Sequence, residues 1–85
     1  MKKTKVIMIS AEECKECSEV KKKIETVFSE EKIAYEMETL IFSTDRAIQV
    51  AIEFGLDTLP SFVVNKTGFN GKIFSKEALL VAAKE

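Results

Sequence analysis

The two cysteines are the residues in this sequence with the clearest chemistry. Cys14 and Cys17 are the only cysteines in the chain, and two residues separate them. A pair at this spacing can exchange disulfides or contribute two thiolates to a metal site. An apolar run at residues 6–9 precedes the pair, and a segment with helical spacing follows it. We therefore expect the pair at a turn from a strand into a helix, a position typical of redox-active cysteines.

The predicted start of a helix gives the two sulfurs different tasks. Free backbone N–H groups and the positive end of the helix dipole stabilise a thiolate on the first cysteine. We expect Cys14 to be the more exposed cysteine, to have a pKa below that of free cysteine and to attack a disulfide. We expect Cys17 to be more buried and to resolve the mixed disulfide. Lys15 favours the thiolate, but three nearby carboxylates oppose it: Glu12, Glu13 and Glu16. The expected lowering of the pKa is therefore smaller than in a strongly oxidising enzyme.

Two other interpretations of the cysteine pair stay open. The first is a metal or iron–sulfur carrier. A closed zinc site takes four ligands, and the chain has no histidine and no further cysteine. Such a carrier would have to complete its site in a dimer, with a partner or with external thiols. The second is a redox-inert interaction domain, because a fold does not fix a function.

Length and composition indicate one small globular unit. With 85 residues, the chain is expected to form a single domain over residues 1–85. Its net charge of −1 gives no electrostatic case for a nucleic-acid partner. The apolar run at residues 6–9 is too short for a signal peptide or a membrane span. We expect a cytoplasmic location, where close cysteines are more often catalytic or metal-binding than structural.

The first half of the chain has the pattern of a strand–helix–strand unit. A continuous apolar run predicts a buried strand at residues 5–10, and helical spacing predicts a helix at residues 14–30. The predicted buried stripe of this helix is Val20, Ile24, Val27 and Phe28. Alternation predicts a half-exposed strand at residues 33–40, with Glu36 and Glu38 facing water. Two strands joined in this way are expected to be parallel, with a right-handed crossover.

The second half begins with another predicted helix, capped by Ser43 or Thr44 and ended by Gly55. Its expected apolar stripe is Ala47, Ile48, Ala51, Ile52 and Phe54. Two short strands at residues 61–65 and 67–70 follow as a hairpin. The register of this hairpin stays open, because residues 70–71 form an Asn-Gly turn dipeptide that competes with the turn at residues 65–68.

A last helix completes the predicted fold. Ser75 is expected to cap it, with three residues facing inward: Leu79, Leu80 and Ala83. The order of elements is then β-α-β-α-β-β-α. Such an order packs as an α/β fold, a four-stranded mixed sheet with helices on both faces. We expect Phe69, in the hairpin, to pack against the core rather than to contact a partner.

The sequence resembles the thioredoxin-like superfamily and looks closest to its small glutaredoxin-like members, also called redox-active disulfide proteins. Three landmarks carry the resemblance, which covers essentially the whole chain. The first is the cysteine pair after the first strand. The second is Thr58-Leu59-Pro60 before the third strand, which matches the T-x-P of the family. The third is Gly71 with residues 75–79, which looks like the family's glycine and final helix.

The resemblance implies a thiol–disulfide oxidoreductase of the minimal, glutaredoxin-type fold, with Cys14 and Cys17 as its catalytic residues. It also implies a cis bond between Leu59 and Pro60, beside the cysteines, which exposes the backbone of Leu59 to a substrate strand. The implied substrate-binding residues are Lys15, Thr58, Leu59, Pro60 and Gly71. No cofactor is implied beyond the cysteines themselves.

The sequence also departs from the patterns of the family. Lys15-Glu16 stands where thioredoxins have Gly-Pro and many glutaredoxins have Pro-Tyr, and Glu13 precedes the pair in place of an aromatic residue. Residues 73–76 replace the Gly-Gly and acidic residue with which glutaredoxins hold glutathione. A thioredoxin-reductase-like electron donor is therefore favoured over glutathione. The expected partner is a disulfide-containing protein or small molecule, and the chain is expected to be a monomer that binds no nucleic acid and no membrane.

Overall fold

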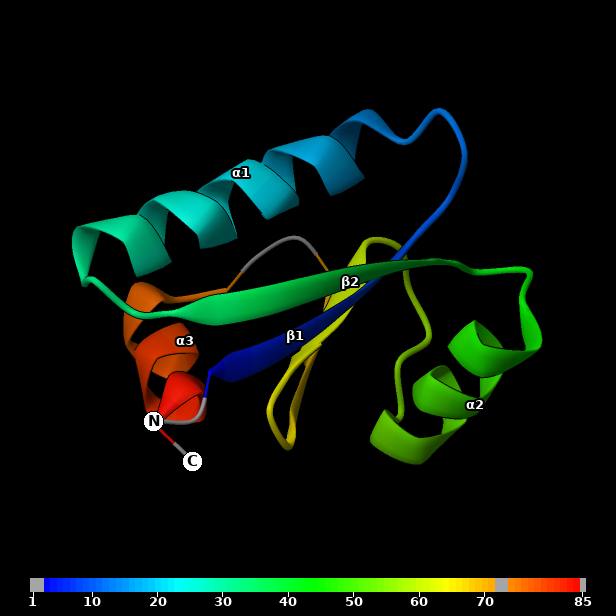
Figure 1. The fold of residues 1–85 in the computed structure, drawn as a ribbon. Helices are drawn as coiled ribbons and strands as arrows, with labels where there is room; N and C mark the ends of the chain where they lie inside the picture. Colours follow the sequence, from blue (N-terminus) through cyan, green and yellow to red (C-terminus); the bar gives the residue numbers. More distant parts are fainter. Residues whose placement is uncertain (1–2, 72–73, 85) are drawn as a thin grey trace.

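The computed structural model describes residues 3–71 and 74–84, which form an α/β fold (Figure 1). Its strands are β1 (Thr4–Ser10), β2 (Tyr35–Ile41), β3 (Ser61–Val64) and β4 (Thr67–Asn70). Its helices are α1 (Lys15–Glu30), α2 (Asp45–Phe54) and α3 (Lys76–Ala83). The order of these elements, β-α-β-α-β-β-α, confirms the predicted order. Within the described residues, no helix is long and apolar enough to cross a membrane.

The strands form a four-stranded mixed sheet in the order β2-β1-β3-β4. β1 pairs with β2 in parallel and with β3 in antiparallel, and β3 and β4 form an antiparallel hairpin. Val64 pairs with Thr67, so the hairpin turns at Asn65 and Lys66 rather than at the Asn-Gly dipeptide. Asn65 has a left-handed backbone (φ 53°), a conformation that asparagine tolerates better than most residues.

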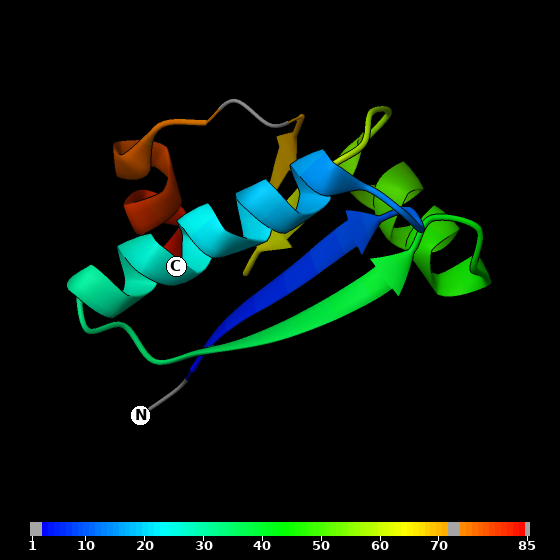
Figure 2. The ribbon, with the colours of Figure 1, turned by 90° about the horizontal axis from the view of Figure 1, so that it is seen from above.

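Helices cover both faces of the sheet, as predicted, and the core accordingly has two parts. Side chains alternate along a strand, so β1 and β3 contribute to both parts. Seen from above, α1 runs in the direction opposite to β1 and β2 rather than across them (Figure 2). On this face the core consists of Val6, Met8, Cys17, Val20, Ile24, Val27, Phe28, Phe62, Val64, Leu79 and Ala82. On the α2 face it consists of Ile9, Ala47, Val50, Leu56 and Val63. The predicted stripe of α1 is confirmed in full.

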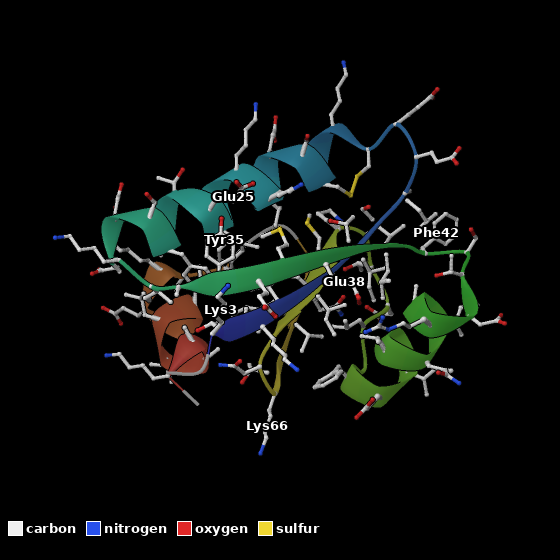
Figure 3. All side chains as sticks on the ribbon, viewed as in Figure 1. Lys3, Glu25, Tyr35, Glu38, Phe42 and Lys66 are labelled. Carbon is white, nitrogen blue, oxygen red and sulfur yellow. A yellow bond between two sulfur atoms is a disulfide. The ribbon has the colours of Figure 1, made fainter. Side chains whose placement is uncertain are left out.

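Edge strand β2 contacts a helix on each face of the sheet, α1 at its start and α2 further along. Tyr35 at its start contacts Phe28 of α1, with ring centroids 5.1 Å apart (Figure 3). Further along, Glu38 is partly buried and forms a two-pronged ion pair with Arg46 of α2. The Glu38 side chain is 42% exposed, so it faces water as predicted, and the guanidinium of Arg46 also binds both of its oxygens.

The predicted inner face of α2 is wrong in part. Ile48 and Ile52 are 47% and 77% exposed, whereas Val50, which the predicted stripe left out, is buried. The helix is apolar around much of its circumference, so its sequence allows more than one inward face. The side of α2 that contains Ala47 and Val50 packs against the sheet. The adjacent side, which contains Ile48 and Ile52, is exposed to solvent. In α3, Leu79 and Ala82 are fully inward, and the predicted Leu80 and Ala83 are only partly buried.

Candidate active site

Cys14 and Cys17 form a disulfide at the N-terminus of α1, with their Cα atoms 5.3 Å apart. Cys14 is the N-cap residue of the helix, and its Sγ accepts a hydrogen bond of 3.1 Å from the backbone N–H of Cys17. The sulfur therefore occupies the place that a Ser or Asp oxygen takes in an ordinary helix cap. Lys15 is the first helical residue, and the predicted turn from strand to helix is present.

The two sulfurs differ in burial as predicted. Cys17 is only 5% exposed and belongs to the core, whereas Cys14 is partly exposed and packs at the edge of that core. An incoming sulfur atom therefore meets Cys14 first. The first backbone N–H groups of a helix lack partners within the helix, so they can stabilise negative charge on Cys14 when the disulfide is reduced.

The loop that leads into the helix is acidic and sharply bent. Glu12 and Glu13 are exposed, and Glu13 has a left-handed backbone (φ 58°), which is uncommon for a residue other than glycine. This bend directs the chain from the end of β1 into α1, so that Cys14 becomes the cap. The two carboxylates disfavour a thiolate beside them, against the effect of the helix terminus.

The loop before β3 runs past the N-terminal turn of α1 in both views of the ribbon (Figures 1 and 2). Its Leu59–Pro60 peptide bond is cis. Pro60 is fully buried, and Leu59 is 40% exposed. The backbone N–H of Gly71 donates to the carbonyl of Pro60 at 3.1 Å, which joins this loop to the end of β4. Gly71 has φ 100°, a conformation that favours glycine.

The structure thus brings four of the five predicted substrate-binding residues into one group. Thr58 completes it, because a Cβ atom added to Gly71 would lie 3.7 Å from Thr58 Oγ1. The fifth residue, Lys15, is exposed and lies next to Cys14 in the chain. Of residues 73–76, in which the glutathione motif of glutaredoxins is lacking, Ile73 lies outside the described residues.

Asn70 holds this loop in place, a role that the sequence analysis missed. Its Oδ1 accepts hydrogen bonds from the backbone N–H of Asp57 (3.2 Å), the backbone N–H of Thr58 (3.1 Å) and the hydroxyl of Thr58 (2.7 Å). Its Nδ2 donates to Asp57 Oδ1 at 2.5 Å. In the sequence, Asn70 is visible only as part of an Asn-Gly dipeptide. Asn70 lies twelve residues after Thr58 in the chain, so no local pattern shows that the two side chains interact.

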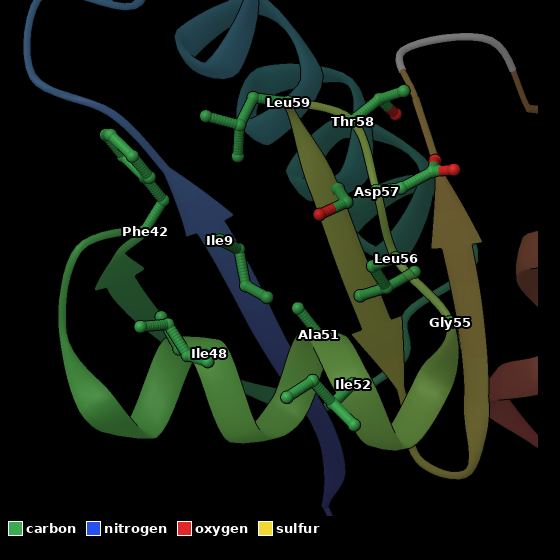
Figure 4. A pocket seen from close by; sticks show the side chains of 12 residues that line it. Ile9, Phe42, Ile48, Ala51, Ile52, Gly55, Leu56, Asp57, Thr58 and Leu59 are labelled. Carbon is green, nitrogen blue, oxygen red and sulfur yellow. The ribbon is translucent and has the colours of Figure 1, made fainter.

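A pocket of about 620 Å³ opens beside the same loop, on the α2 side of the sheet (Figure 4). We call it the α2 pocket; its lining is Ile9, Phe42, Ala47, Ile48, Ala51, Ile52, Gly55, Leu56, Asp57, Thr58, Leu59 and Ser61. Most of these side chains are apolar. Phe42, to which the sequence analysis gave no role, is 51% exposed and lies at the mouth of the pocket with Leu59.

Three phenylalanine rings, two of them from the β3–β4 hairpin, pack against one another. Phe69 stacks on Phe62 with ring centroids 4.7 Å apart, and Phe74 meets the ring of Phe62 edge-on at 5.0 Å. The predicted packing role of Phe69 is therefore confirmed. Concerning metals, no group of three or more His, Cys, Asp or Glu side chains in residues 3–71 and 74–84 could hold an ion.

Known proteins resemble the chain in structure but not in sequence. No protein-family model and no curated protein sequence matches it. Among solved structures, one described as thioredoxin-2, a component of the malaria parasite protein secretion machinery, superposes with a TM-score of 0.61 at 16% identity, over 100% of this chain and 86% of that chain. A second, described as a malarial protein, has a TM-score of 0.49 at 20% identity, over 98% of this chain and 94% of that chain. At these identities the first likeness concerns the fold alone. The chain therefore has a thioredoxin-like fold.

Proposed function

We propose that this protein is a thiol–disulfide oxidoreductase of the small, glutaredoxin-like kind. One observation carries the proposal: the cysteine pair closes a disulfide at the N-terminus of a helix, with Cys14 partly exposed and Cys17 buried. This arrangement suits a nucleophile that substrates can reach and a resolving thiol that they cannot. The thioredoxin-like fold is compatible with this function, but a fold alone does not establish one.

The proposed reaction begins with both cysteines reduced. The Cys14 thiolate attacks one sulfur of a substrate disulfide, and the other substrate sulfur leaves as a thiolate that takes up a proton. Cys17 then loses its proton and attacks Cys14 Sγ in the mixed disulfide. The second substrate sulfur leaves and is protonated in turn. The substrate gains two electrons and two protons, and the protein is left with the Cys14–Cys17 disulfide.

The surrounding residues have proposed roles in binding rather than in bond making. Thr58, Leu59 and Gly71 form the surface on which the substrate backbone lies, and the buried Pro60 supports this surface from beneath. Thr58 and Leu59 are the exposed members of this group. Lys15 favours the thiolate of Cys14 by its charge. We further propose that the protein acts as a monomer in the cytoplasm and is reduced by a dithiol donor such as a thioredoxin-reductase-like enzyme.

Reduction of insulin disulfides, with dithiothreitol as the final reductant, tests this function. The wild-type protein should accelerate the reaction, and Cys14→Ser should abolish the acceleration because it removes the nucleophile. Cys17→Ser is the matched variant: reduced, freed of dithiothreitol and mixed with insulin, it should still attack and should accumulate as a mixed disulfide with the substrate, visible by mass spectrometry. A wild-type rate no higher than that of Cys14→Ser would contradict the proposal.

The reduction potential of the cysteine pair gives an independent test. Metal-free protein is equilibrated in buffers with different ratios of reduced to oxidised glutathione, which set different reduction potentials. Its free thiols are then trapped by alkylation and counted by mass spectrometry. A two-electron couple within the range of about −200 to −270 mV found in glutaredoxins and thioredoxins would support an exchange enzyme. If no disulfide forms across that range, a metal carrier or a redox-inert domain becomes the better interpretation.

A further inference from the structure

We propose that the α2 pocket is a subsite for protein substrates, and that it takes a large apolar side chain near the substrate cysteine, next to a lysine or arginine. The inference rests on the proposed function and names the class of substrate. It concerns the α2 face of the sheet, opposite the face on which α1 and α3 pack.

The first argument is the concentration of exposed apolar side chains. Phe42, Ile48, Ile52 and Leu59 all line the α2 pocket and are strongly exposed. The other strongly exposed large hydrophobic side chain in the described part of the chain, Val81, belongs to α3. Single exposed apolar residues are ordinary, but several around one hollow mark a surface that binds something. Figure 4 shows these side chains surrounding the opening above α2.

The second argument is that the α2 pocket is continuous with the candidate active site. Thr58 and Leu59 belong both to its lining and to the group around the cis-proline. On its other side, the backbone N–H of Phe42 donates to the carbonyl of Ser10 at 2.8 Å. Phe42 therefore lies beside the loop that leads from β1 to Cys14. A substrate strand that lies across Leu59 with its cysteine at Cys14 can place a neighbouring side chain in the pocket.

The third argument is charge, which determines the chemistry of the partner. Residues 6–13 and 33–65, which surround the pocket, contain one basic residue, Arg46, and no lysine. Lys5 lies on the same face of β1 as Ile9, but four residues away from it and opposite Glu36 of β2. The two segments contain seven acidic residues: Glu12, Glu13, Glu36, Glu38, Asp45, Glu53 and Asp57. Arg46 is already paired with Glu38, at 2.7 and 2.8 Å. The surface around the apolar opening is therefore negative, and it complements a substrate with lysine or arginine beside its apolar residue.

Two peptides of equal length test the subsite. Each carries one cysteine as a mixed disulfide with the same coloured aromatic thiol. In one peptide Leu and Lys flank the cysteine, and in the other Ser and Glu do. We expect kcat/KM to be about tenfold higher for the Leu–Lys peptide, the factor that covering about half of a large apolar side chain supplies. Added salt should reduce the preference, because it screens the part that charge contributes.

Ile52→Ser and Val81→Ser form a matched pair of variants. Both residues are exposed helix residues, so neither change should unfold the protein, but only Ile52 lines the α2 pocket. Ile52→Ser should lower the kcat/KM ratio of the two peptides to the part that charge contributes, which added salt then reduces. Val81→Ser should leave that ratio as in the wild type. Equal rates for both peptides, or equal effects of the two variants, would overturn the subsite.

The proposed function and the subsite fail in different ways. Bis(2-hydroxyethyl) disulfide, which has no side chain to place in the pocket, is measured with the wild-type protein. If it is reduced while the two peptides react equally, the subsite is wrong and the oxidoreductase stands. If neither it nor the peptides react, the proposed function is wrong, and the subsite proposal, which depends on that function, is wrong as well. Sedimentation that shows a dimer which Ile52→Ser dissociates would assign the surface to a second copy and overturn a substrate subsite.

Discussion

At the scale of single residues, Asn70 is the side chain on which the geometry of the loop before β3 depends. It makes four hydrogen bonds to Asp57 and Thr58, twelve or thirteen residues earlier in the chain. All of them are exposed, so water can replace each bond at a small net cost in free energy. These hydrogen bonds mainly hold Asp57 and Thr58, the two residues that precede Leu59, in one conformation.

Asn70→Ala is expected to act mainly on substrate binding. It should raise KM for a peptide disulfide several-fold and change kcat less, because the loop must then be ordered when the substrate binds. The free energy of unfolding should fall by only about 1–2 kcal/mol. Asn70→Asp keeps the Oδ1 acceptor but sets a carboxylate against Asp57, so it should also raise KM. Steady-state kinetics and urea denaturation measure both effects, and an unchanged KM for Asn70→Ala would count against a positioning role.

Tyr35 makes stability depend on pH in the alkaline range. Burial raises the pKa of Tyr35 above its usual value of 10.0, and the negative charge of Glu25 on α1 raises this pKa further (Figure 3). The folded state therefore holds the phenol proton more tightly than the unfolded state does. This contribution to stability is fully present below pH 10 and is lost as the pH rises through the higher pKa of the folded protein.

The expected result is a free energy of unfolding that declines more steeply with pH above about 10 in the wild type than in Tyr35→Phe. Urea denaturation at several pH values between about 8 and 11 measures both slopes. The two proteins differ only in the phenol group, so the difference between the slopes isolates Tyr35. Equal slopes would show that Tyr35 has the same pKa in the folded and unfolded states.

At the scale of elements, the turn of the β3–β4 hairpin is fixed by Asn65. Its Oδ1 accepts a hydrogen bond of 3.1 Å from the backbone N–H of Lys5, next to the start of β1. Its Nδ2 donates to the carbonyls of Ala82 (2.9 Å) and Ala83 (3.3 Å) at the end of α3. Carbonyls at the end of a helix lack partners within the helix, so one side chain joins the hairpin, the sheet and α3.

Two substitutions separate the two contributions of Asn65. Asn65→Gly loses the side-chain hydrogen bonds but keeps the left-handed backbone at little steric cost, and should lower the free energy of unfolding by about 1–2 kcal/mol. Asn65→Ala loses the same bonds and must also adopt a strained φ, which should cost about 1 kcal/mol more. Thermal and urea denaturation give both values. An alanine variant as stable as the glycine variant would contradict this prediction and would show that the alanine variant avoids the left-handed φ by changing the conformation of the turn.

At the scale of the whole molecule, the two parts of the core lie on opposite faces of one sheet, and the disulfide contributes only Cys17 to the buried residues of one of them. The disulfide closes a very small ring, because its cysteines are three positions apart. Such a ring removes little entropy from the unfolded chain. An exchange enzyme needs this independence, since its fold must persist in both redox states.

Reduction should therefore leave the fold intact and lower the free energy of unfolding by about 2 kcal/mol or less. Far-ultraviolet circular dichroism with and without a phosphine reductant checks the fold, and urea denaturation checks the stability. The double variant Cys14→Ser/Cys17→Ser, which cannot form the bond, should behave like the reduced protein. Loss of helical signal on reduction would instead make the disulfide a structural staple.

The sequence by itself determined the features that depend on neighbours along the chain. The buried stripe of α1, the cap at Ser75, and the turn that places the cysteines at a helix start all follow from local periodicity and capping. For α2 the sequence allowed Ser43 or Thr44 as the cap, and the structure has Thr44. The same local spacing permits Cys14 and Cys17 to close their bond within one turn of helix. For these features a stretch of about ten residues contains the physical cause, so its pattern is sufficient.

The tertiary structure alone decided which parts of the chain meet. It buried Ala47 and Val50 of α2 and left Ile48 and Ile52 outside, although all four are apolar. It brought Asn70 to the loop before β3, and it gathered exposed apolar side chains from β2's end, α2 and that loop around one pocket. Each outcome depends on how the elements pack across the sheet, and the free energy of that packing is a sum over distant contacts that no local pattern contains.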